Sequence, residues 1–261
     1  MAGNRTVKRC IEIIEFVARS ENGASLKDIV EVLDMPKTSA YDIIRELVSA
    51  GMLAEKRGEI NKFSIGLKAF QIGNEYLNET DLITVARPIV KEMADKTNKT
   101  AFIAVMSEGY VTYIYKYEPK TSIITTSNIG TKNPIHCTSL GKAILSGMSR
   151  EDQLKELSFS NMKRFTDNTL VDREELLKDI DAAAQRGYAI DNREIEDHTL
   201  CIGSPIFNHE GKAVAGLSVS GFYSKERDIE FEGGLIRQAA LDISRQLGYE
   251  GNDGTRHPHE H

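Results

Sequence analysis

Four side chains of the kinds that do nucleophilic chemistry or bind metals lie in the second half of the chain: His136, Cys137, Asp191 and Cys201. A cysteine activated by a histidine can act as a nucleophile, and cysteine, histidine and aspartate together can hold a transition metal. Their spacing, however, matches no HExxH, CxxC or GxSxG motif. We therefore expect no catalytic residue, no metal site and no cofactor.

A second group of polar side chains lies in the stretch LDMPKTSAYDIIREL (33–47), where a proline opens a helical pattern. The first turn of this helix would present lysine and hydroxyl side chains beside unpaired backbone N–H groups, a combination that can bind DNA phosphate. An arginine two turns further on can pair with a guanine base in the major groove. We therefore expect DNA contacts from Lys37, Thr38, Ser39, Tyr41, Asp42 and Arg45.

Short helices would hold this polar face in place. Apolar residues at helical spacing predict a first helix over about 6–20. Ser25, with Asp28 three residues later, predicts the capped start of a short second helix. Pro36 suits the entrance of the third helix, where its missing N–H costs little, and Gly51 suits the left-handed position just after its end.

The segment 53–65 has the pattern of a hairpin that follows these helices. Its two arms would flank Arg57-Gly58-Glu59, and Arg57 and Lys62 would contact the DNA backbone or the minor groove. Three short helices followed by a hairpin are typical of a winged helix-turn-helix, which we place at residues 1–66.

The distribution of charge is uneven along the chain, whose formal net charge is −6. Residues 1–66 carry ten Lys/Arg and ten Asp/Glu, whereas the remaining 195 residues carry 23 and 29. A net charge of zero argues against DNA binding, because affinity depends on the neutralisation of phosphates. From periodicity alone, a DNA-binding unit and a simple packing unit of three helices stay about equally open.

The rest of the chain alternates between strand and helix patterns. We assign residues 67–80 to a linker helix, 81–250 to a second domain and 251–261 to a disordered tail. Pro88 should kink or restart the helix that follows Asp81. The expected elements are strands at 100–106, 110–117 and 122–128, a loop feeding a helix at 130–147, a helix at 173–187, a hairpin at 204–221 and a last helix at about 225–247. This order predicts an α+β domain with an antiparallel or mixed sheet flanked by helices.

Cysteine usage and hydropathy indicate the compartment. The three cysteines are far apart and odd in number, which fits a reducing cytoplasm better than a disulfide framework. No apolar run approaches the roughly 18 residues of a membrane-spanning helix, and MAGNRTVKRC lacks the apolar region of a secretion signal. We expect a cytoplasmic protein without membrane contact.

Segments from about residue 5 to 248 resemble the IclR family of bacterial transcription regulators. They include TVKRCIEIIEFVA, SLKDIVEVLDMPKTSAYDIIREL, DLITVARPIVKEMADKTNKTAF, GTKNPIHCTSLGKAIL and RGYAIDNREIEDHTLCIGSPIFNHEGKAVAGLSVSG. The resemblance implies an N-terminal winged helix-turn-helix and a C-terminal GAF-like effector-binding domain, with a central sheet flanked by helices. It also implies a homodimer or homotetramer that binds a palindromic DNA operator and controls genes for the catabolism of small organic acids, aromatics or sugar acids.

The same resemblance implies the effector site. Backbone N–H groups at the start of the GKA helix can hold a carboxylate, and two serines two apart on a strand can both hydrogen-bond one oxygen. The implied contacts are Ser139, Leu140, Gly141, Asp191, Cys201, Ser218 and Ser220, with Glu194 as a further candidate and His136 close by. Two segments depart from the family pattern: NKFSIG replaces an arginine-tyrosine pair in the wing, and His198-Thr199 replaces a glycine-apolar pair.

The expected function is therefore that of a DNA-binding transcription regulator that responds to a small carboxylate-bearing effector. The alternative is a GAF-like small-molecule-binding or catalytic module whose helical head binds another protein. Salt separates the two, because DNA affinity falls steeply as salt rises and a protein-binding head has no such affinity to lose.

Overall fold

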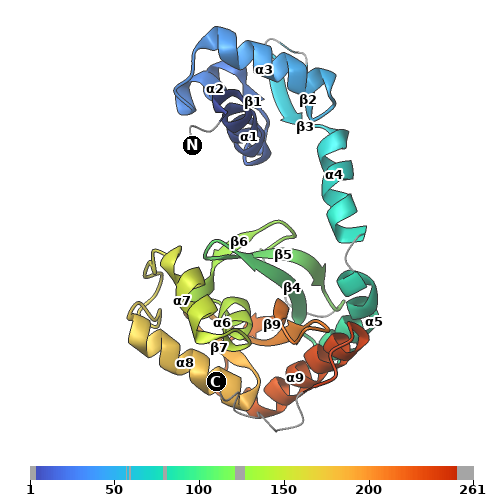
Figure 1. Cartoon of the computed structure of the whole chain (residues 1–261), viewed down its shortest axis with the longest axis vertical. Helices are drawn as coiled ribbons and strands as arrows, with labels where there is room; N and C mark the ends of the chain where they lie inside the picture. The colour runs from blue at the N-terminus through green and yellow to red at the C-terminus, as the bar shows by residue number, and fades with distance from the viewer. Residues whose placement is uncertain (1–3, 57, 59, 79–80, 121–126, 252–261) are drawn as a thin grey trace, which may run out of the picture. The chain divides into compact units, whose positions relative to one another are not determined.

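The computed structural model describes residues 4–56, 58, 60–78, 81–120 and 127–251 (Figure 1). The chain divides into two compact units, Met1–Thr80 and Asp81–His261. No helix in the described ranges has both the length and the apolar character needed to cross a bilayer.

The first unit begins with helices α1 (Arg5–Ala18), α2 (Leu26–Val32) and α3 (Lys37–Ser49). Ser25 and Asp28 form the predicted capping box: the Asp28 N–H donates to Ser25 Oγ at 3.2 Å, and the Ser25 N–H donates to Asp28 Oδ2 at 2.8 Å. Pro36 is the N-cap of α3, and Gly51 follows the helix with φ +75°, a left-handed conformation that favours glycine. These local signals explain why the helices start and stop where they do.

A three-stranded antiparallel sheet completes the first unit. Its strands β1 (Ala24–Ser25), β2 (Leu53–Lys56) and β3 (Lys62–Ile65) lie in the order β1-β3-β2. The predicted hairpin is therefore present, and the two-residue strand β1 adds to it. Ile13, Ile29, Ile44, Leu53 and Phe63 are buried in one core, so that all three helices pack on the sheet as in a winged helix-turn-helix. Helix α4 (Leu67–Asn78) follows.

The second unit is built on a six-stranded antiparallel sheet with the strand order β6-β5-β4-β9-β8-β7. Its strands are β4 (Thr100–Ser107), β5 (Tyr110–Tyr117), β6 (Lys132–Pro134), β7 (Ala189–Asn192), β8 (Thr199–Phe207) and β9 (Ala213–Phe222). Strands β4 and β9 meet in the middle although more than a hundred residues separate them in the sequence.

Helices cover both faces of this sheet, as Figure 1 shows. Helix α9 (Ile229–Gln246) packs on β8 and on α5 (Asp81–Thr97). On the other face lie a short 3-10 helix η1 (Ile135–Cys137), α6 (Ser139–Ser146), α7 (Arg150–Ser158) and α8 (Arg173–Arg186). The architecture is α+β, with a curled antiparallel sheet between two helical layers.

Several expectations need correction. Helix α5 continues through Pro88 without a restart, because its packing on α9 and on strands β4 and β5 compensates for the lost backbone hydrogen bond. Helix α7 was not predicted. Of its residues only Gln153 and Leu157 are buried, so the sequence shows no apolar face at helical spacing. Strand β7 has four residues, too few for an alternation to stand out. The strand expected at 122–128 falls mainly outside the described residues, as does the tail.

Candidate functional site

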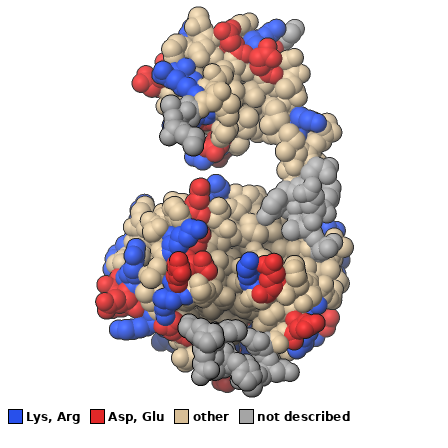
Figure 2. All heavy atoms as spheres, viewed as in Figure 1, with Lys and Arg blue, Asp and Glu red and all other residues tan. Residues whose placement is uncertain are grey.

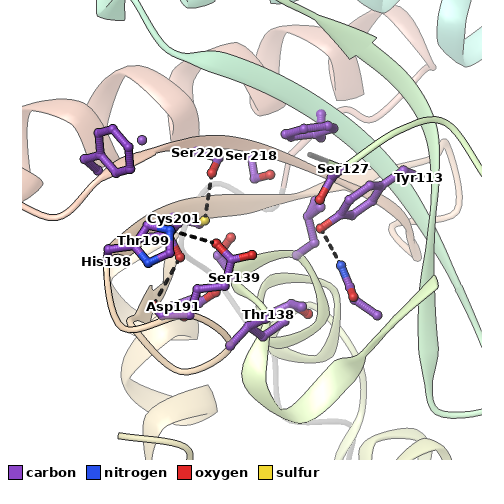
Figure 3. Close-up of a pocket in the computed structure, with 17 residues that line it drawn as sticks. Tyr113, Ser127, Thr138, Ser139, Asp191, His198, Thr199, Cys201, Ser218 and Ser220 are labelled. Carbon is purple, nitrogen blue, oxygen red and sulfur yellow. Dashed lines mark hydrogen bonds and ion pairs between the residues drawn. The ribbon is translucent and has the colours of Figure 1, made fainter. Parts of the chain in front are cut away.

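A cavity of about 360 Å³ lies in the second unit at the N-terminal end of α6 (Figure 3). Its volume is at the lower end of the range for pockets that bind small organic molecules. The lining residues come from the sheet, from the loop between β5 and β6, from the N-cap and first turn of α6 and from the turn between β7 and β8. They are Phe102, Tyr113, Ser127, Asn133, Thr138, Ser139, Leu140, Asp191, Ile195, Glu196, His198, Thr199, Cys201, Ser218, Ser220, Gly221 and Phe222.

The first turn of α6 forms one wall of the cavity. Thr138 is the N-cap, and its Oγ1 accepts a hydrogen bond of 3.0 Å from the Gly141 N–H. The N–H groups of Ser139 and Leu140 have no hydrogen-bond partner among the described residues. These two groups, at the positive end of the helix dipole, can bind a carboxylate.

The opposite wall is a row of polar side chains on three adjacent strands. Asp191 of β7 lies directly opposite Cys201 of β8, and Cys201 lies directly opposite Ser220 of β9. Residues that face one another across a sheet project to the same side, and the Cys201 thiol donates to Ser220 Oγ at 3.3 Å. Ser218, two residues before Ser220, faces the cavity as well. The row can accept and donate several hydrogen bonds to one small molecule.

A glycine brings these two walls together. Gly203 of β8 lies opposite Ser218, and a Cβ atom at position 203 would lie 2.9 Å from the carbonyl oxygen of Ser139. Only a residue without a side chain therefore allows the first turn of α6 to approach the sheet this closely. This close approach places the free N–H groups of α6 beside the polar row.

Asp191 is the most perturbed acid of the cavity. It is only 3% exposed, and its Oδ1 accepts a hydrogen bond of 2.8 Å from the Glu194 N–H. Burial, with the nearby charge of Glu194, raises the pKa of Asp191 to about 7. Asp191 can therefore gain or lose a proton near neutral pH.

The charged groups of the cavity are mainly acidic. Its described lining includes Asp191 and Glu196 but neither lysine nor arginine. The ring of His198 lies 3.6 Å from Glu196 at a position open to solvent. A bound carboxylate would thus depend on backbone N–H groups and hydroxyls rather than on a cation.

The structure brings together six of the seven residues expected from the resemblance. Ser139, Leu140, Asp191, Cys201, Ser218 and Ser220 all line the cavity. Gly141 is buried behind them, and its N–H is already used by the cap of α6. Glu194 lies below the cavity, where it pairs with Lys142.

The sequence reasoning missed the aromatic and amide residues of the cavity. Phe102 comes from β4, Tyr113 from β5 and Asn133 from β6, and Ser127 lies in the loop between β5 and β6. Helical and strand periodicity predicted the strands but not their pairing. His198 and Thr199, noted as departures from the family pattern, also line the cavity.

The thiols of Cys137 and Cys201 are poorly suited to act as nucleophiles. Burial raises the pKa of Cys137 and raises the pKa of Cys201 to about 12, and the charge of Asp191 adds to both shifts, so the thiols stay protonated. His136 bonds instead with the backbone oxygen of Lys163 at 3.0 Å and lies 3.3 Å from Ser160 Oγ. Within the described part of the chain, no three His, Cys, Asp or Glu side chains are grouped to hold a metal.

In the first unit, the polar face of α3 is open to solvent. Lys37, Thr38, Tyr41, Asp42 and Arg45 are exposed, with Tyr41 at 50%, whereas Ser39 is half-buried and accepts a hydrogen bond of 3.3 Å from Arg9. No side chain caps the N-terminus of α3. Its first-turn N–H groups therefore remain available to a phosphate.

The wing is only partly described. Lys62 of β3 is half-buried, and Arg57 lies outside the described residues. Figure 2 shows Lys and Arg interspersed with Asp and Glu on the visible face of the first unit, in keeping with its balanced charge.

Two family models match the chain. The IclR helix-turn-helix domain matches residues 6–57, and the bacterial transcriptional regulator IclR C-terminal domain matches residues 74–245. The regulator KdgR of Dickeya chrysanthemi is 33% identical over 232 residues, which cover 88% of this chain and 75% of KdgR. The repressor AllR of Escherichia coli K12 is 29% identical over 248 residues, which cover 94% and 91% of the two chains. These relatives are named as transcription regulators, not as enzymes.

Solved structures agree with this match. IclR of Thermotoga maritima superposes with a TM-score of 0.74 at 29% identity, covering 94% of this chain and 99% of that one. A homologue of IclR from Microbacterium hydrocarbonoxydans, solved with 4-hydroxybenzoate, shares the fold with a TM-score of 0.80 at 22% identity. That superposition covers 93% of this chain and 98% of the homologue.

Proposed function

This chain belongs to the IclR family of bacterial transcription regulators, and we propose that it controls a catabolic operon in response to a small carboxylate-bearing effector. It would act in the cytoplasm as a homodimer or homotetramer on a palindromic operator. The observation that supports this proposal best is the cavity at the start of α6, where two free N–H groups face a row of hydroxyl, thiol and carboxyl side chains.

The effector would bind with its carboxylate on the N–H groups of Ser139 and Leu140 and on the hydroxyl of Ser218. Asp191, Cys201 and Ser220 would hold its other polar atoms. No cation lies among the described lining residues, so a small monoanion suits the cavity better than a polyanion. An organic acid or sugar acid fits these contacts.

The DNA would lie against α3. The exposed N-terminal turn with Lys37, Thr38 and Ser39 would bind phosphate, while Tyr41, Asp42 and Arg45 would face base edges or neighbouring phosphates. Arg57 and Lys62 of the wing would contact the flanking backbone. Effector binding would change operator affinity only through a difference in its own affinity for the free and the DNA-bound arrangement.

Gel retardation at two salt concentrations tests the DNA-binding role. We expect the full-length protein to bind duplex DNA from its own upstream region, and to lose affinity steeply as salt rises. Arg45→Ala should weaken specific binding about tenfold or more. Arg173→Ala, an exposed arginine at the start of α8 in the second unit, is the control and should bind like the parent. Absence of salt-dependent retardation by the parent would point to a protein-binding head instead.

Thermal shift with a panel of keto acids and sugar acids tests the effector role. Asp191→Ala and Ser218→Ala should abolish the shift that the active panel member gives the parent, with DNA retardation unchanged in the absence of ligand. Variants that respond like the parent would show that the effector binds elsewhere.

A further inference from the structure

The cavity has a second end that the contacts assigned above do not use. Figure 3 shows Tyr113 and Ser127 on the side of the cavity opposite Asp191 and His198. Asn133 lines the cavity beside Tyr113. A ligand held only by the start of α6 and by the polar row would leave this end empty.

A break in strand pairing points Tyr113 into the cavity. Ile103 of β4 pairs with Tyr115 and Ala104 pairs with Tyr113, so the register shifts by one residue between them. Such a bulge redirects side chains on the bulged strand. Tyr113 therefore shares the cavity face with Phe102, whereas Tyr115 packs against the guanidinium of Arg87 on α5.

The phenol of Tyr113 is held in a fixed position. Its ring stacks on Phe102 with the centroids 4.8 Å apart, and it is only 8% exposed. Asn133 Nδ2 donates a hydrogen bond of 3.0 Å to the phenol oxygen. A packed ring and a fixed hydrogen-bond partner define one direction for the remaining O–H group.

This end of the cavity offers a neutral donor. Burial raises the pKa of Tyr113 to about 12, so the phenol keeps its proton at any physiological pH. Asn133 already donates to the phenol oxygen, and the Ser127 hydroxyl also lies within hydrogen-bonding reach. If Ser127 donates its hydroxyl hydrogen to Tyr113, the Tyr113 O–H can donate to a ligand. If Tyr113 donates to Ser127 instead, the Ser127 O–H can donate to the ligand.

The two ends therefore differ in charge. The described residues at the Tyr113 end of the lining are uncharged, whereas the other end carries the carboxyl groups of Asp191 and Glu196. A neutral donor in a buried site binds a carbonyl or hydroxyl oxygen well. A second carboxylate would lose its hydration there, and the ammonium of Lys116, which lies 5.8 Å from the centre of the Phe102 ring, is already paired with Glu118 at 3.0 Å.

We propose that the effector is a carboxylic acid with a second, uncharged oxygen at its far end, and that Tyr113 and Ser127 select it by a hydrogen bond to that oxygen. This inference rests on the proposed effector site. A polyhydroxylated chain and a hydroxylated aromatic ring both provide this pair of groups. The carbon skeleton would lie along Phe102 and Leu140, between the two polar ends.

Matched pairs of probes test the proposal by calorimetry on the full-length protein. Gluconate is compared with hexanoate, and 4-hydroxybenzoate with benzoate, because each pair differs in the hydroxyl groups of the skeleton. We expect the parent to prefer the hydroxylated member of at least one pair. Tyr113→Phe removes the donor and keeps the ring, and should reduce that preference roughly 3- to 10-fold, the worth of one neutral hydrogen bond.

Tyr115→Phe is the matched control, since it makes the same change two residues along the same strand outside the cavity. It should leave the preference unchanged. If Tyr113→Phe does not fold, Ser127→Ala takes its place and should also reduce the preference. Loss of affinity for both members of a pair alike would show that Tyr113 only packs the cavity, and would overturn the proposal.

Short acids separate this inference from the proposed function. If the parent binds pyruvate or glycolate but neither gluconate nor 4-hydroxybenzoate, the selection by Tyr113 is overturned and the proposed effector site remains. A parent that binds none of the six probes would overturn both. The aliphatic and aromatic pairs also show which of the two skeletons the cavity accepts.

Discussion

The ammonium of Lys142 lies 2.6 Å from Glu194 Oε1 and joins the helix that forms one wall of the cavity to the turn that forms another. The Lys142 side chain is 1% exposed, and its Nζ also lies 2.8 Å from Asp179 Oδ2 on α8. Burial lowers the pKa of Lys142, but the two carboxylates reverse this effect and raise it. Lys142 therefore stays charged below the cavity, and its contact with the Glu194 side chain fixes the residue whose N–H bonds Asp191.

Lys142→Met should strongly destabilise the second unit. The change leaves the buried carboxylate of Glu194 without its cation, and among the described residues Asp179, which is half-buried, keeps only Arg186 at 3.7 Å. Removing the partner of a buried charge typically costs about 3–5 kcal/mol. Adding Glu194→Gln removes one of the charges and should recover part of the loss. Denaturant unfolding at pH 7 measures both effects.

Lys178→Met, on the exposed side of α8, is the control and should change the free energy of unfolding by no more than about 0.5 kcal/mol. Equal stability of Lys142→Met and the parent would show that the ion pairs of Lys142 are not structural.

Asp191→Asn should stabilise the chain at high pH and not at low pH. Burial raises the folded-state pKa of Asp191 from the ordinary value of 3.8 to about 7, so the folded chain binds the proton more tightly than the unfolded chain. The contribution of Asp191 to the stability of the parent therefore falls as pH rises from about 4 to 7, and this fall stops above that range. The variant lacks this group and should gain roughly 2–4 kcal/mol over the parent at pH 8.

Unfolding curves recorded from pH 4 to 8 measure this difference. Asp197→Asn, an exposed change in the same turn, should show no pH-dependent gain over the parent. A gain of Asp191→Asn that stayed constant over the whole range would mean that Asp191 titrates normally in the folded chain.

Sequence patterns predicted the first unit well, because its signals are local. The capping box of Ser25 and Asp28, the helix start at Pro36 and the turn at Gly51 each depend on a few adjacent residues. The short strand β1 was missed, since Ala24 and Ser25 become a strand only by pairing with β3. Long-range pairing of this kind leaves no periodic trace in so short a segment.

The cavity was only partly predictable for the same reason. The family motifs indicated the start of α6 and the serines of β9, but Tyr113 depended on a bulge that no alternation pattern reveals. Simple alternation puts Tyr113 and Tyr115 on one face, whereas the register shift separates them. Lys142 and Glu194 are far apart in the sequence, so their buried pairing was equally hidden.

Gly141→Ala should disrupt the start of α6. A Cβ atom at this position would lie 2.2 Å from the carbonyl oxygen of Ile135, and backbone atoms cannot move aside cheaply. We expect a loss of about 3 kcal/mol in the free energy of unfolding. The effector-induced thermal shift should also disappear, because the displaced turn carries the N–H groups of Ser139 and Leu140.

Gly234→Ala is the matched control for this change. Gly234 lies in helix α9, and a Cβ atom at this position would meet no other part of the described chain within 4 Å. Alanine should therefore stabilise the helix by up to about 1 kcal/mol. A Gly141→Ala chain as stable as this control would show that η1 and α6 can separate without cost.

Lys37→Ala should weaken DNA binding uniformly across sequences. Lys37 is exposed at the first position of α3, where no side chain caps the helix and the backbone N–H groups are open to phosphate. A lysine that neutralises one phosphate contributes about one unit to the slope of log K against log salt. The variant should therefore lose that unit of slope on both random and upstream duplex DNA. Arg45→Ala, by contrast, should mainly lower the preference for the upstream DNA. An unchanged slope for Lys37→Ala would place the phosphate backbone away from the N-terminus of α3.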